Sequence, residues 1–438
     1  MRAGKPLDRD WSRREFISTA ARVGAVAVAS TVAAPSVVRA ESNTIKIGHL
    51  TSKSGVRAAF SEPADWSVKQ IRELLKDGLK VGSKTYPVEI LSRDTQSTAV
   101  GAGEAGNALV LRDKVDLLLG DDADSHYAVG DLCDINGLPF VSTMTQWEPF
   151  IFTRKSTPEK GYPWSFLFFW GASDVMRNYV SLWDSLKTNK TAGTLYFDHP
   201  VGQAFADPKL GLPAGLNAGG YKIVDGGFFK GDADDFSNQI NAFKAGGAQI
   251  LTGFMAPPQF VTFWNQAAQL GYRPEVATIA AAFLFPSGIE ALGDRGDGMT
   301  TEIWWTPNVP FKSSLTGETA KQVAAKWQSD TGKQWTQPLG YFHAEFEVAL
   351  AALKNSGDPK DRAAVRNAIQ TMNLDTLVGP VNFKDSKIKS VAVTEVAMGQ
   401  WRRQKSESKF KYDLAITLNP TAPHIQIEEK TKLLSELG

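Results

Sequence analysis

The segment Gly101-Ala-Gly-Glu-Ala-Gly106 has the glycine spacing of a dinucleotide-binding turn. Asp121 follows about 20 residues further on, where such a site carries its ribose-binding acid. That turn joins the first strand of a sheet to its helix. Here the motif lies inside a helix predicted over residues 98–112, after a second strand, and Thr98 is the expected N-cap. We therefore predict that these small residues let the helix pack closely on a sheet, and that they bind no nucleotide.

The other chemically active residues form no catalytic or metal-binding pattern. His343-Ala-Glu345 has the His-x-Glu spacing of zinc deaminases, but those enzymes need two further cysteines and the chain has only Cys133. The five histidines are scattered, so we predict no metal site. Asp121-Asp-Ala-Asp124 lacks the spacing of a calcium loop and is predicted to be a solvated loop. Without a catalytic constellation, the chain is predicted to be a binding protein and not an enzyme.

The N-terminal residues have the features of an export signal. Ser12-Arg-Arg-Glu-Phe-Ile17 precedes a weakly hydrophobic stretch that ends at Val38-Arg39-Ala40, a sequence that signal peptidases read. This pattern predicts a twin-arginine signal peptide over residues 1–40 and a mature chain that begins near Glu41. Arg22 interrupts the stretch, so we do not expect it to remain as a membrane anchor. The expected location is the periplasm.

Charge and length narrow the choice of function. The formal net charge is +1, and the predicted leader holds seven basic and three acidic residues, a net of +4, which leaves about −3 for the rest. No basic surface is therefore expected to bind nucleic acid. The remaining chain, about 400 residues, exceeds what one core usually holds, so two domains are predicted. A single cysteine allows no disulfide within the chain.

Short apolar runs alternate with amphipathic segments along most of the chain. The predicted strands are 44–50, 88–91, 115–119, 139–141, 194–197, 222–224, 249–251 and 276–279; the predicted helices are 62–79, 98–112, 126–136, 204–218, 235–245 and 259–270. Strands that alternate with helices form parallel sheets with right-handed crossovers. Two such series, separated by residues 150–171, predict an α/β fold with two doubly wound parallel-sheet lobes. The segments after residue 300, which include strand-like runs at 381–383 and 391–398, extend neither series and predict further crossings between the lobes.

Several fragments together resemble one family. Ile45-Lys-Ile-Gly48, Gly137-Leu-Pro-Phe-Val-Ser142, Asp235-Phe-Ser237 and Gly379-Pro380 occur in the order and spacing of the leucine/isoleucine/valine-binding proteins. These proteins are solute-binding components of ABC importers, and they have the type I periplasmic-binding fold. The resemblance implies a small-molecule ligand, an ABC-transporter membrane permease as partner, no cofactor and no reaction. We also expect a monomer.

The resemblance further implies a hinge of three crossings, near Gly171, Trp305 and Val393. The expected domains are therefore a signal peptide (1–40), a first lobe (41–171 plus 305–393) and a second lobe (172–304 plus 394–438). In this family the ligand lies between the lobes. Carried over by position, the ligand-binding residues are Phe60, Ser125, Met144, Gln146, Trp147, Val201, Phe254 and Ala281.

The chain departs from the family at one of these positions. Amino-acid-binding members place a carboxylate there to pair with the ligand's α-ammonium, whereas this chain has the run Ala280–Ala282. An unpaired ammonium in a closed cleft would cost several kcal/mol. The candidate contacts are instead apolar: Phe60, Trp147, Phe254, Met255 and Phe283, joined by Trp304 and Trp305. We therefore expect a small carboxylate or amide with an apolar or aromatic body, its carboxylate held by Ser125 and loop amides.

The function that these observations favour is ligand capture for an ABC importer, with an amino acid kept as a possible ligand. One alternative is a ligand-sensing protein of the same fold. Another is a cofactor-dependent secreted enzyme, because twin-arginine export often carries proteins with bound cofactors.

The paired arginines of the leader allow a direct test. Replacing Arg13 and Arg14 by lysine should retain the precursor in the cytoplasm, because twin-arginine export depends on the arginine pair itself. Cell fractionation followed by immunoblotting measures this retention. Unimpaired export of the double variant would contradict the predicted leader type.

Overall fold

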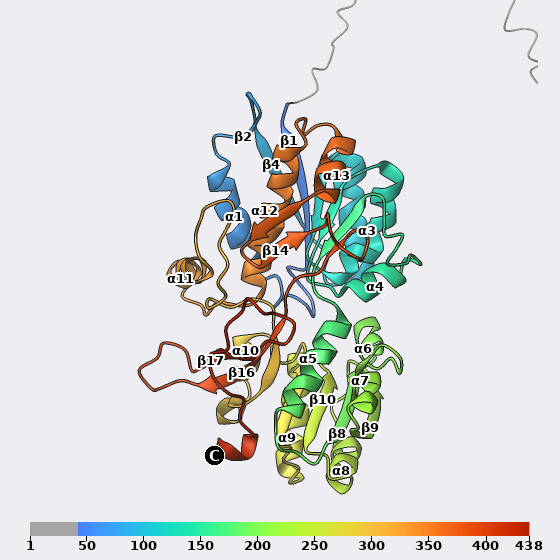
Figure 1. Ribbon diagram of the computed structural model, residues 1–438, viewed down its shortest axis with the longest axis vertical. Helices are drawn as coiled ribbons and strands as arrows, with labels where there is room; N and C mark the ends of the chain where they lie inside the picture. The colour runs from blue at the N-terminus through green and yellow to red at the C-terminus, as the bar shows by residue number, and fades with distance from the viewer. Residues whose placement is uncertain (1–42, 438) are drawn as a thin grey trace, which may run out of the picture. The chain divides into compact units, whose positions relative to one another are not determined.

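The computed structural model describes residues 43–437, so the leader predicted for residues 1–40 lies outside the described part (Figure 1). Two large sheets organise the described chain. The first contains β1 (Ile45–Thr51), β4 (Val88–Asp94), β5 (Leu117–Gly120), β6 (Phe140–Ser142), β7 (Ser165–Phe168) and β15 (Val391–Ala392). The second contains β8 (Thr191–Phe197), β9 (Lys222–Phe229), β10 (Ile250–Phe254), β11 (Val276–Ala280), β12 (Thr300–Ile303), β16 (Ala397–Arg403) and β17 (Tyr412–Leu418).

The first sheet is wholly parallel, in the order β15-β7-β6-β5-β1-β4. Helix α12 (Pro338–Asn355) contacts α1 (Ala64–Leu74), and α2 (Ala99–Asn107) contacts α3 (Ala123–Asn136). Figure 1 shows α12 on one side of β1 and α3 on the other. Because both faces are covered, β1 is buried at every residue except Lys46. A central strand of a doubly wound sheet has this continuous apolar character.

The second sheet has the order β17-β16-β12-β11-β10-β8-β9. Its strands β8 to β12 are parallel, whereas β16 and β17 are antiparallel additions at one edge. Helix α5 (Ala172–Asp184) contacts α7 (Leu212–Ala218), and α8 (Ser237–Ala245) contacts α9 (Pro257–Gln269). Two lobes, each built on a parallel sheet with helices around it, confirm the predicted α/β fold class.

Three segments carry the chain from one sheet to the other. Residues 169–171 connect β7 with α5, residues 304–306 leave β12 toward α11 (Ala320–Thr331) and α12, and residues 393–396 connect β15 with β16. The sequence pattern treated residues 391–398 as one strand. In the structure this stretch is divided between the two sheets, because the third crossing interrupts it.

Other differences from the sequence prediction have local causes. The helix predicted over residues 62–79 ends at Leu74. Leu79, the last residue of the predicted range, instead begins a hairpin of β2 (Leu79–Val81) and β3 (Lys84–Tyr86). The helix predicted over residues 204–218 is two helices, α6 (Pro200–Phe205) and α7, because Pro208 cannot donate a backbone hydrogen bond. The stretch from 150 to 171, predicted as a separator, contains the second half of α4 (Trp147–Phe152) and strand β7.

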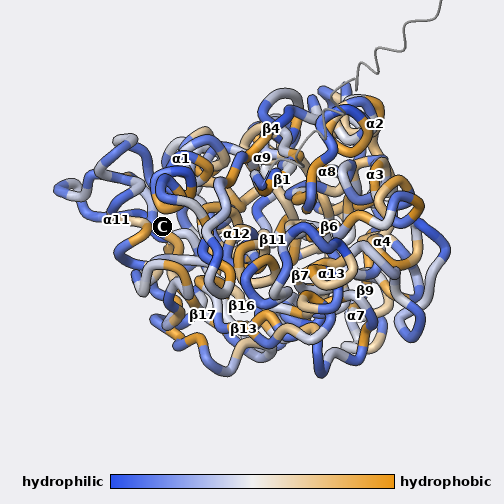
Figure 2. Tube along the Cα trace, turned by 90° about the horizontal axis from the view of Figure 1, so that it is seen from above, coloured by the Kyte–Doolittle hydropathy of each residue, from blue (hydrophilic) through white to orange (hydrophobic). Residues whose placement is uncertain are grey.

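The remaining elements complete the cover of the sheets: α10 (Pro286–Glu290), α13 (Arg362–Gln370), β13 (Asn373–Thr376), β14 (Gly379–Asn382) and short π- and 3₁₀-turns at Ala108–Arg112, Gly293–Gly296 and Leu434–Glu436. Figure 2 shows hydrophilic residues along the outer loops beside α11. Within residues 43–437 no helix is both long and apolar enough to cross a membrane.

The glycine motif at residues 101–106 allows close packing, but against helix α3 and not, as predicted, against a sheet. Thr98 caps α2 by accepting a hydrogen bond from the Gly101 amide at 3.0 Å. A Cβ atom on Gly106 would lie 2.1 Å from Val129 Cγ1 of α3, so only glycine allows this close approach of the two helices. Gly103, on the same helix, has no atom within 4 Å of such a Cβ. The motif therefore serves helix packing.

This contrast gives a matched pair of variants. Gly106→Ala should destabilise the protein by about 1–3 kcal/mol, because an added methyl overpacks the α2–α3 contact. Gly103→Ala should stabilise it by about 0.5–1 kcal/mol, since alanine loses less backbone entropy in a helix. Urea unfolding of both variants measures the two changes. Equal effects would contradict the packing role of Gly106.

Candidate functional site

A cavity of about 400 Å³ lies at the carboxyl ends of strands from both sheets. Its lining residues come from the loops after β1, β4, β5, β6 and β7 in the first sheet and after β8 to β12 in the second. Parallel α/β sheets bind ligands at this edge, because the strand ends and helix N-termini present backbone groups there. The cavity is therefore the candidate ligand site.

Six of the eight residues expected from the sequence line this cavity: Phe60, Met144, Gln146, Val201, Phe254 and Ala281. The other two do not. Ser125 is fully buried, and its hydroxyl donates to Asp122 Oδ1 at 2.9 Å. The indole of Trp147 lies against Gly171 of the first crossing segment, and it leaves no room for a Cβ atom on Gly171. Among the further aromatic candidates, Trp304 lines the cavity, whereas Trp305 is buried and packs against Trp335 with ring centroids 6.1 Å apart.

Two of the lining residues have an unusual backbone conformation. Met144 follows β6 with φ 55°, and Ala281 follows β11 with φ 68°. Residues other than glycine rarely adopt this left-handed region, which costs about 1–2 kcal/mol. Both lie just beyond a strand end, Met144 two residues after β6 of the first sheet and Ala281 directly after β11 of the second. Such strain is common where a loop must present main-chain groups to a ligand.

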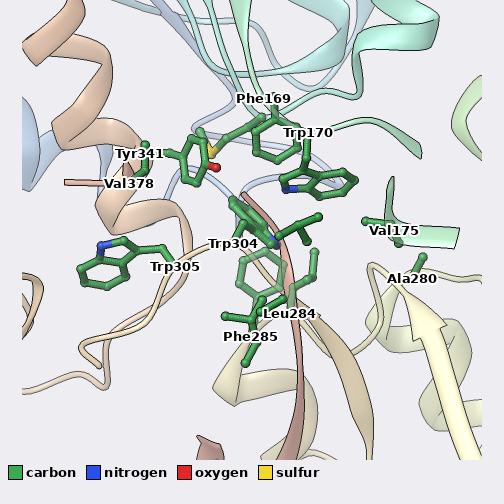
Figure 3. Packing of buried hydrophobic residues seen from close by; sticks show 14 of the residues in the cluster. Phe169, Trp170, Val175, Ala280, Leu284, Phe285, Trp304, Trp305, Tyr341 and Val378 are labelled. Carbon is green, nitrogen blue, oxygen red and sulfur yellow. The ribbon is translucent and has the colours of Figure 1, made fainter. Parts of the chain in front are cut away.

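Aromatic side chains form the wall nearest the crossing segments. Figure 3 shows Trp304 between Phe169 and Trp170 on one side and Phe285 on the other. The ring centroids of Phe169 and Trp304 are 5.4 Å apart, and those of Trp304 and Tyr341 are also 5.4 Å apart, both edge-on. These contacts have the spacing of favourable aromatic pairs. The first and second crossing segments thus pack on each other at the cavity.

A second aromatic group lines the cavity from the other sheet. The rings of Phe197 and His199 stack at 5.8 Å, and those of His199 and Phe254 at 6.5 Å. Burial, and then the charge of Arg57, lower the pKa of His199. Its ring is therefore neutral near pH 7 and adds to the apolar surface. Phe254 is the member of this group that the sequence analysis identified.

Several buried hydrogen-bond donors of the cavity lining lack a partner among the described residues. They are the indole Nε1 atoms of Trp170 and Trp304, the hydroxyl of Thr145, and Nε of Arg57. The guanidinium of Arg57 forms an ion pair with Asp124. A buried donor without an acceptor costs about 1–3 kcal/mol, so such groups are normally matched by water or ligand. The set therefore suits a ligand that offers hydrogen-bond acceptors.

The lining carboxyl groups of Asp122 and Asp124 are already engaged. Asp122 caps α3: its Oδ1 accepts from the Ser125 amide at 2.8 Å, and its Oδ2 accepts from the hydroxyls of Thr95, at 2.8 Å, and Ser52. Asp124 is paired with Arg57. The predicted solvated loop is wrong for these residues, because Asp121 and Asp122 are buried within the site.

Glu302 is an acidic lining residue that the sequence analysis did not identify. It lies on β12 beside the end of β11, is 2 % exposed, and accepts a hydrogen bond from the Tyr179 hydroxyl at 2.5 Å. Thr301 donates to the same oxygen at 3.2 Å. Burial raises the pKa of Glu302 above its ordinary value, and hydrogen bonds from Tyr179 and the Ala281 backbone oppose that rise. Glu302 lies next to Ala281 because β12 pairs with β11, and this pairing cannot be recognised from the spacing of residues in the sequence.

The raised pKa of Glu302 predicts a pH-dependent stability. Because the folded protein holds this proton more tightly than the unfolded chain, the contribution of Glu302 is fully present below about pH 4.5 and decreases as pH rises. Glu302→Gln should therefore gain stability relative to the unsubstituted chain between about pH 5 and pH 8. Urea unfolding across this range tests it, with the exposed Glu104→Gln as control. A pH-independent difference would contradict the raised pKa of Glu302.

A family model described as periplasmic binding protein matches residues 44–407. The chain belongs to this family. The resemblance to the leucine/isoleucine/valine-binding proteins is thereby confirmed, and the chain is a solute-binding protein of the ABC-transporter type. Periplasmic binding proteins hold small ligands outside the cytoplasm and deliver them to ABC permeases. The fold typically carries no enzymatic activity.

Solved structures show the same fold. A leucine-binding protein LivK from Thermotoga maritima matches with TM-score 0.66 and 20 % identity, covering 86 % of this chain and 99 % of its own. LivJ from Streptococcus pneumoniae, in complex with isoleucine, matches with TM-score 0.65 and 16 % identity, covering 85 % of this chain and 99 % of LivJ. A solute-binding protein from R. palustris, in complex with 4-hydroxybenzoate, matches with TM-score 0.68 and 17 % identity, covering 86 % of this chain and 98 % of its own.

Proposed function

We propose that this periplasmic binding protein captures a small carboxylate or amide with an aromatic or apolar body for an ABC importer. The observation that carries the proposal is the combination of unpartnered buried donors with an aromatic wall. Trp170 and Trp304 contribute to both, since each supplies a ring face and an indole N–H without an acceptor. Arg57 adds a positive charge beside them. A carboxylate on an aromatic ring matches all three properties.

The state of the acidic residues in the cavity lining favours a ligand that is a carboxylic acid without an α-ammonium group. Asp122 is saturated by hydrogen bonds, Asp124 is paired with Arg57, and Ala281 offers no charge at the position where relatives place a carboxylate. An ammonium bound at Asp122 or Asp124 would have to displace one of these interactions. Relatives of the same fold are known with 4-hydroxybenzoate and with 3,4-dihydroxybenzoic acid bound, although another holds isoleucine.

Closure of the cleft is the proposed mechanism. Trp170 and Trp304 lie in the first two crossing segments, so a ligand that contacts them contacts the hinge itself. Contacts made to both lobes at once exist only in the closed state and shift the population toward it. The permease then recognises the closed form.

A second ligand class, the α-amino acids, is favoured by one observation. The Glu302 carboxyl lies beside Ala281 and could replace the missing ammonium-binding group from the neighbouring strand. It would have to ionise and exchange its contact with Tyr179 for the ligand. We therefore design the test to separate the two classes.

Calorimetry with matched ligand pairs provides that test. 3-Phenylpropanoate and phenylalanine differ only in the α-ammonium, as do 4-methylpentanoate and leucine. We expect the unsubstituted protein to bind each acid at least tenfold more tightly than its amino acid. Ala281→Glu should narrow or reverse this preference, because a carboxylate pairs with the ammonium. Ala281→Gln is the matched neutral control, and it should leave the preference for the acids unchanged.

Two further variants identify the groups responsible. Phe254→Ala should weaken all four ligands alike, since it removes apolar contact and no charge. Arg57→Gln should weaken the acids by about tenfold or more, as expected when one charge-assisted hydrogen bond is lost. Tight leucine binding that Glu302→Gln abolishes would instead establish Glu302 as the ammonium partner and overturn the proposed ligand class.

A further inference from the structure

Three ionisable side chains from distant parts of the chain meet beneath the cavity floor. His49 lies on β1, Asp121 follows β5, and Glu345 lies on α12. One nitrogen or oxygen from each of the three lies within 4.8 Å of the others. All three residues are at most 1 % exposed. The His-x-Glu motif that drew attention in the sequence does not act as a unit, because His343 faces Ser313 at 2.7 Å while Glu345 faces His49.

The cluster contains buried acceptors without donors. Neither carboxylate oxygen of Glu345 has a hydrogen-bond partner among the described residues, and the same holds for Asp121 Oδ1. Glu345 Oε2 lies 3.6 Å from His49 Nε2, which is too long for a hydrogen bond. A fully buried carboxyl group of this kind calls for a positive partner.

The spacing of the three groups suits a small divalent cation. Zinc bonds to histidine nitrogen and carboxylate oxygen at about 2.0–2.2 Å, so neighbouring ligand atoms of a tetrahedral site lie about 3.3 Å apart. His49 Nε2 lies 2.9 Å from Asp121 Oδ2 and 3.6 Å from Glu345 Oε2, on either side of that value. Two carboxylates and a neutral imidazole would balance the double charge.

The surroundings of His49 favour the same role. Its Nδ1 lies 3.2 Å from Ser92 Oγ, and its Nε2 lies 2.9 Å from Asp121 Oδ2. In the tautomer in which Nδ1 donates to Ser92, the Nε2 lone pair is available to a metal held between His49 and Asp121. Phe342 and Phe346 pack edge-on against the imidazole, with ring centroids 5.9 and 5.7 Å away. They hold the ring in place and keep water from that side. Metal-ligating histidines in proteins commonly have such a hydrogen-bonded second nitrogen.

We propose that His49, Asp121 and Glu345 form a binding site for a divalent cation of the zinc type. Asp121 also lines the ligand cavity, which provides the route of entry. The ion would join β1, the loop after β5 and α12, and so tie the helix to the sheet at the floor of the cavity. Zinc binding at this site can be measured without any ligand in the cavity, so its test does not depend on the proposed ligand class.

The test uses zinc binding to protein purified without a histidine tag. After treatment with a chelator and dialysis, isothermal titration with zinc chloride should show one ion per chain. Glu345→Gln keeps the side-chain shape and should weaken binding by about a hundredfold, since it removes an anionic ligand. Ser92→Ala should weaken it by about tenfold, as loss of a partner to a ligating histidine does. Anomalous diffraction at the zinc edge should place the ion between the three side chains.

A surface pair supplies the control. His424 is exposed and pairs with Glu395, so His424→Gln removes a histidine–carboxylate pair outside the cluster and should leave zinc binding unchanged. Circular dichroism shows whether each variant is folded. Absence of zinc binding by the folded, unsubstituted protein would overturn the proposal and favour a proton shared between Asp121 and Glu345. Equal affinity of the unsubstituted protein and a folded Glu345→Gln variant would also overturn it, as would loss of binding in His424→Gln alone.

Discussion

The packing of aromatic rings between the crossing segments is the contact on which the rest of this structure depends. Phe169 and Trp170 belong to the first crossing, and Trp304 to the second. Their rings are 4.4–6.5 Å apart and nearly fully buried, and Tyr341 of α12 packs on two of them. Because the same rings form the cavity wall, the strength of the hinge contact and the shape of the ligand site cannot vary independently.

The polar chemistry of the cavity follows from how its charges are already used. Asp122 is committed to capping α3, and Asp124 to Arg57. Glu302 is buried against the Tyr179 hydroxyl. Most of the lining groups that lack a partner can donate a hydrogen bond, and Asp121 Oδ1 is an acceptor among them. A site in which unmet donors predominate selects for ligands that accept hydrogen bonds, which is the physical basis for favouring an acid.

Much of the fold could be predicted from the sequence because its signal is local. Periodicity placed most strands of both sheets within a few residues, and the fragment order identified the family. The predictions that failed depend on non-local context. Residues 391–398 look like one strand but are divided by a crossing, and residues 204–218 look like one helix but break near Pro208.

By itself, the sequence determined the two-lobed α/β class, the solute-binding family and the general position of the cavity, since strand ends follow from chain order. Six of the eight residues chosen by position line the cavity for that reason. Only the tertiary structure placed Glu302 beside Ala281, turned Ser125 away from the cavity toward Asp122, and brought Glu345 within reach of His49, 296 positions earlier. Such neighbours are created by strand pairing and by the packing of α12 on the sheet, and neither leaves a spacing signal in the chain.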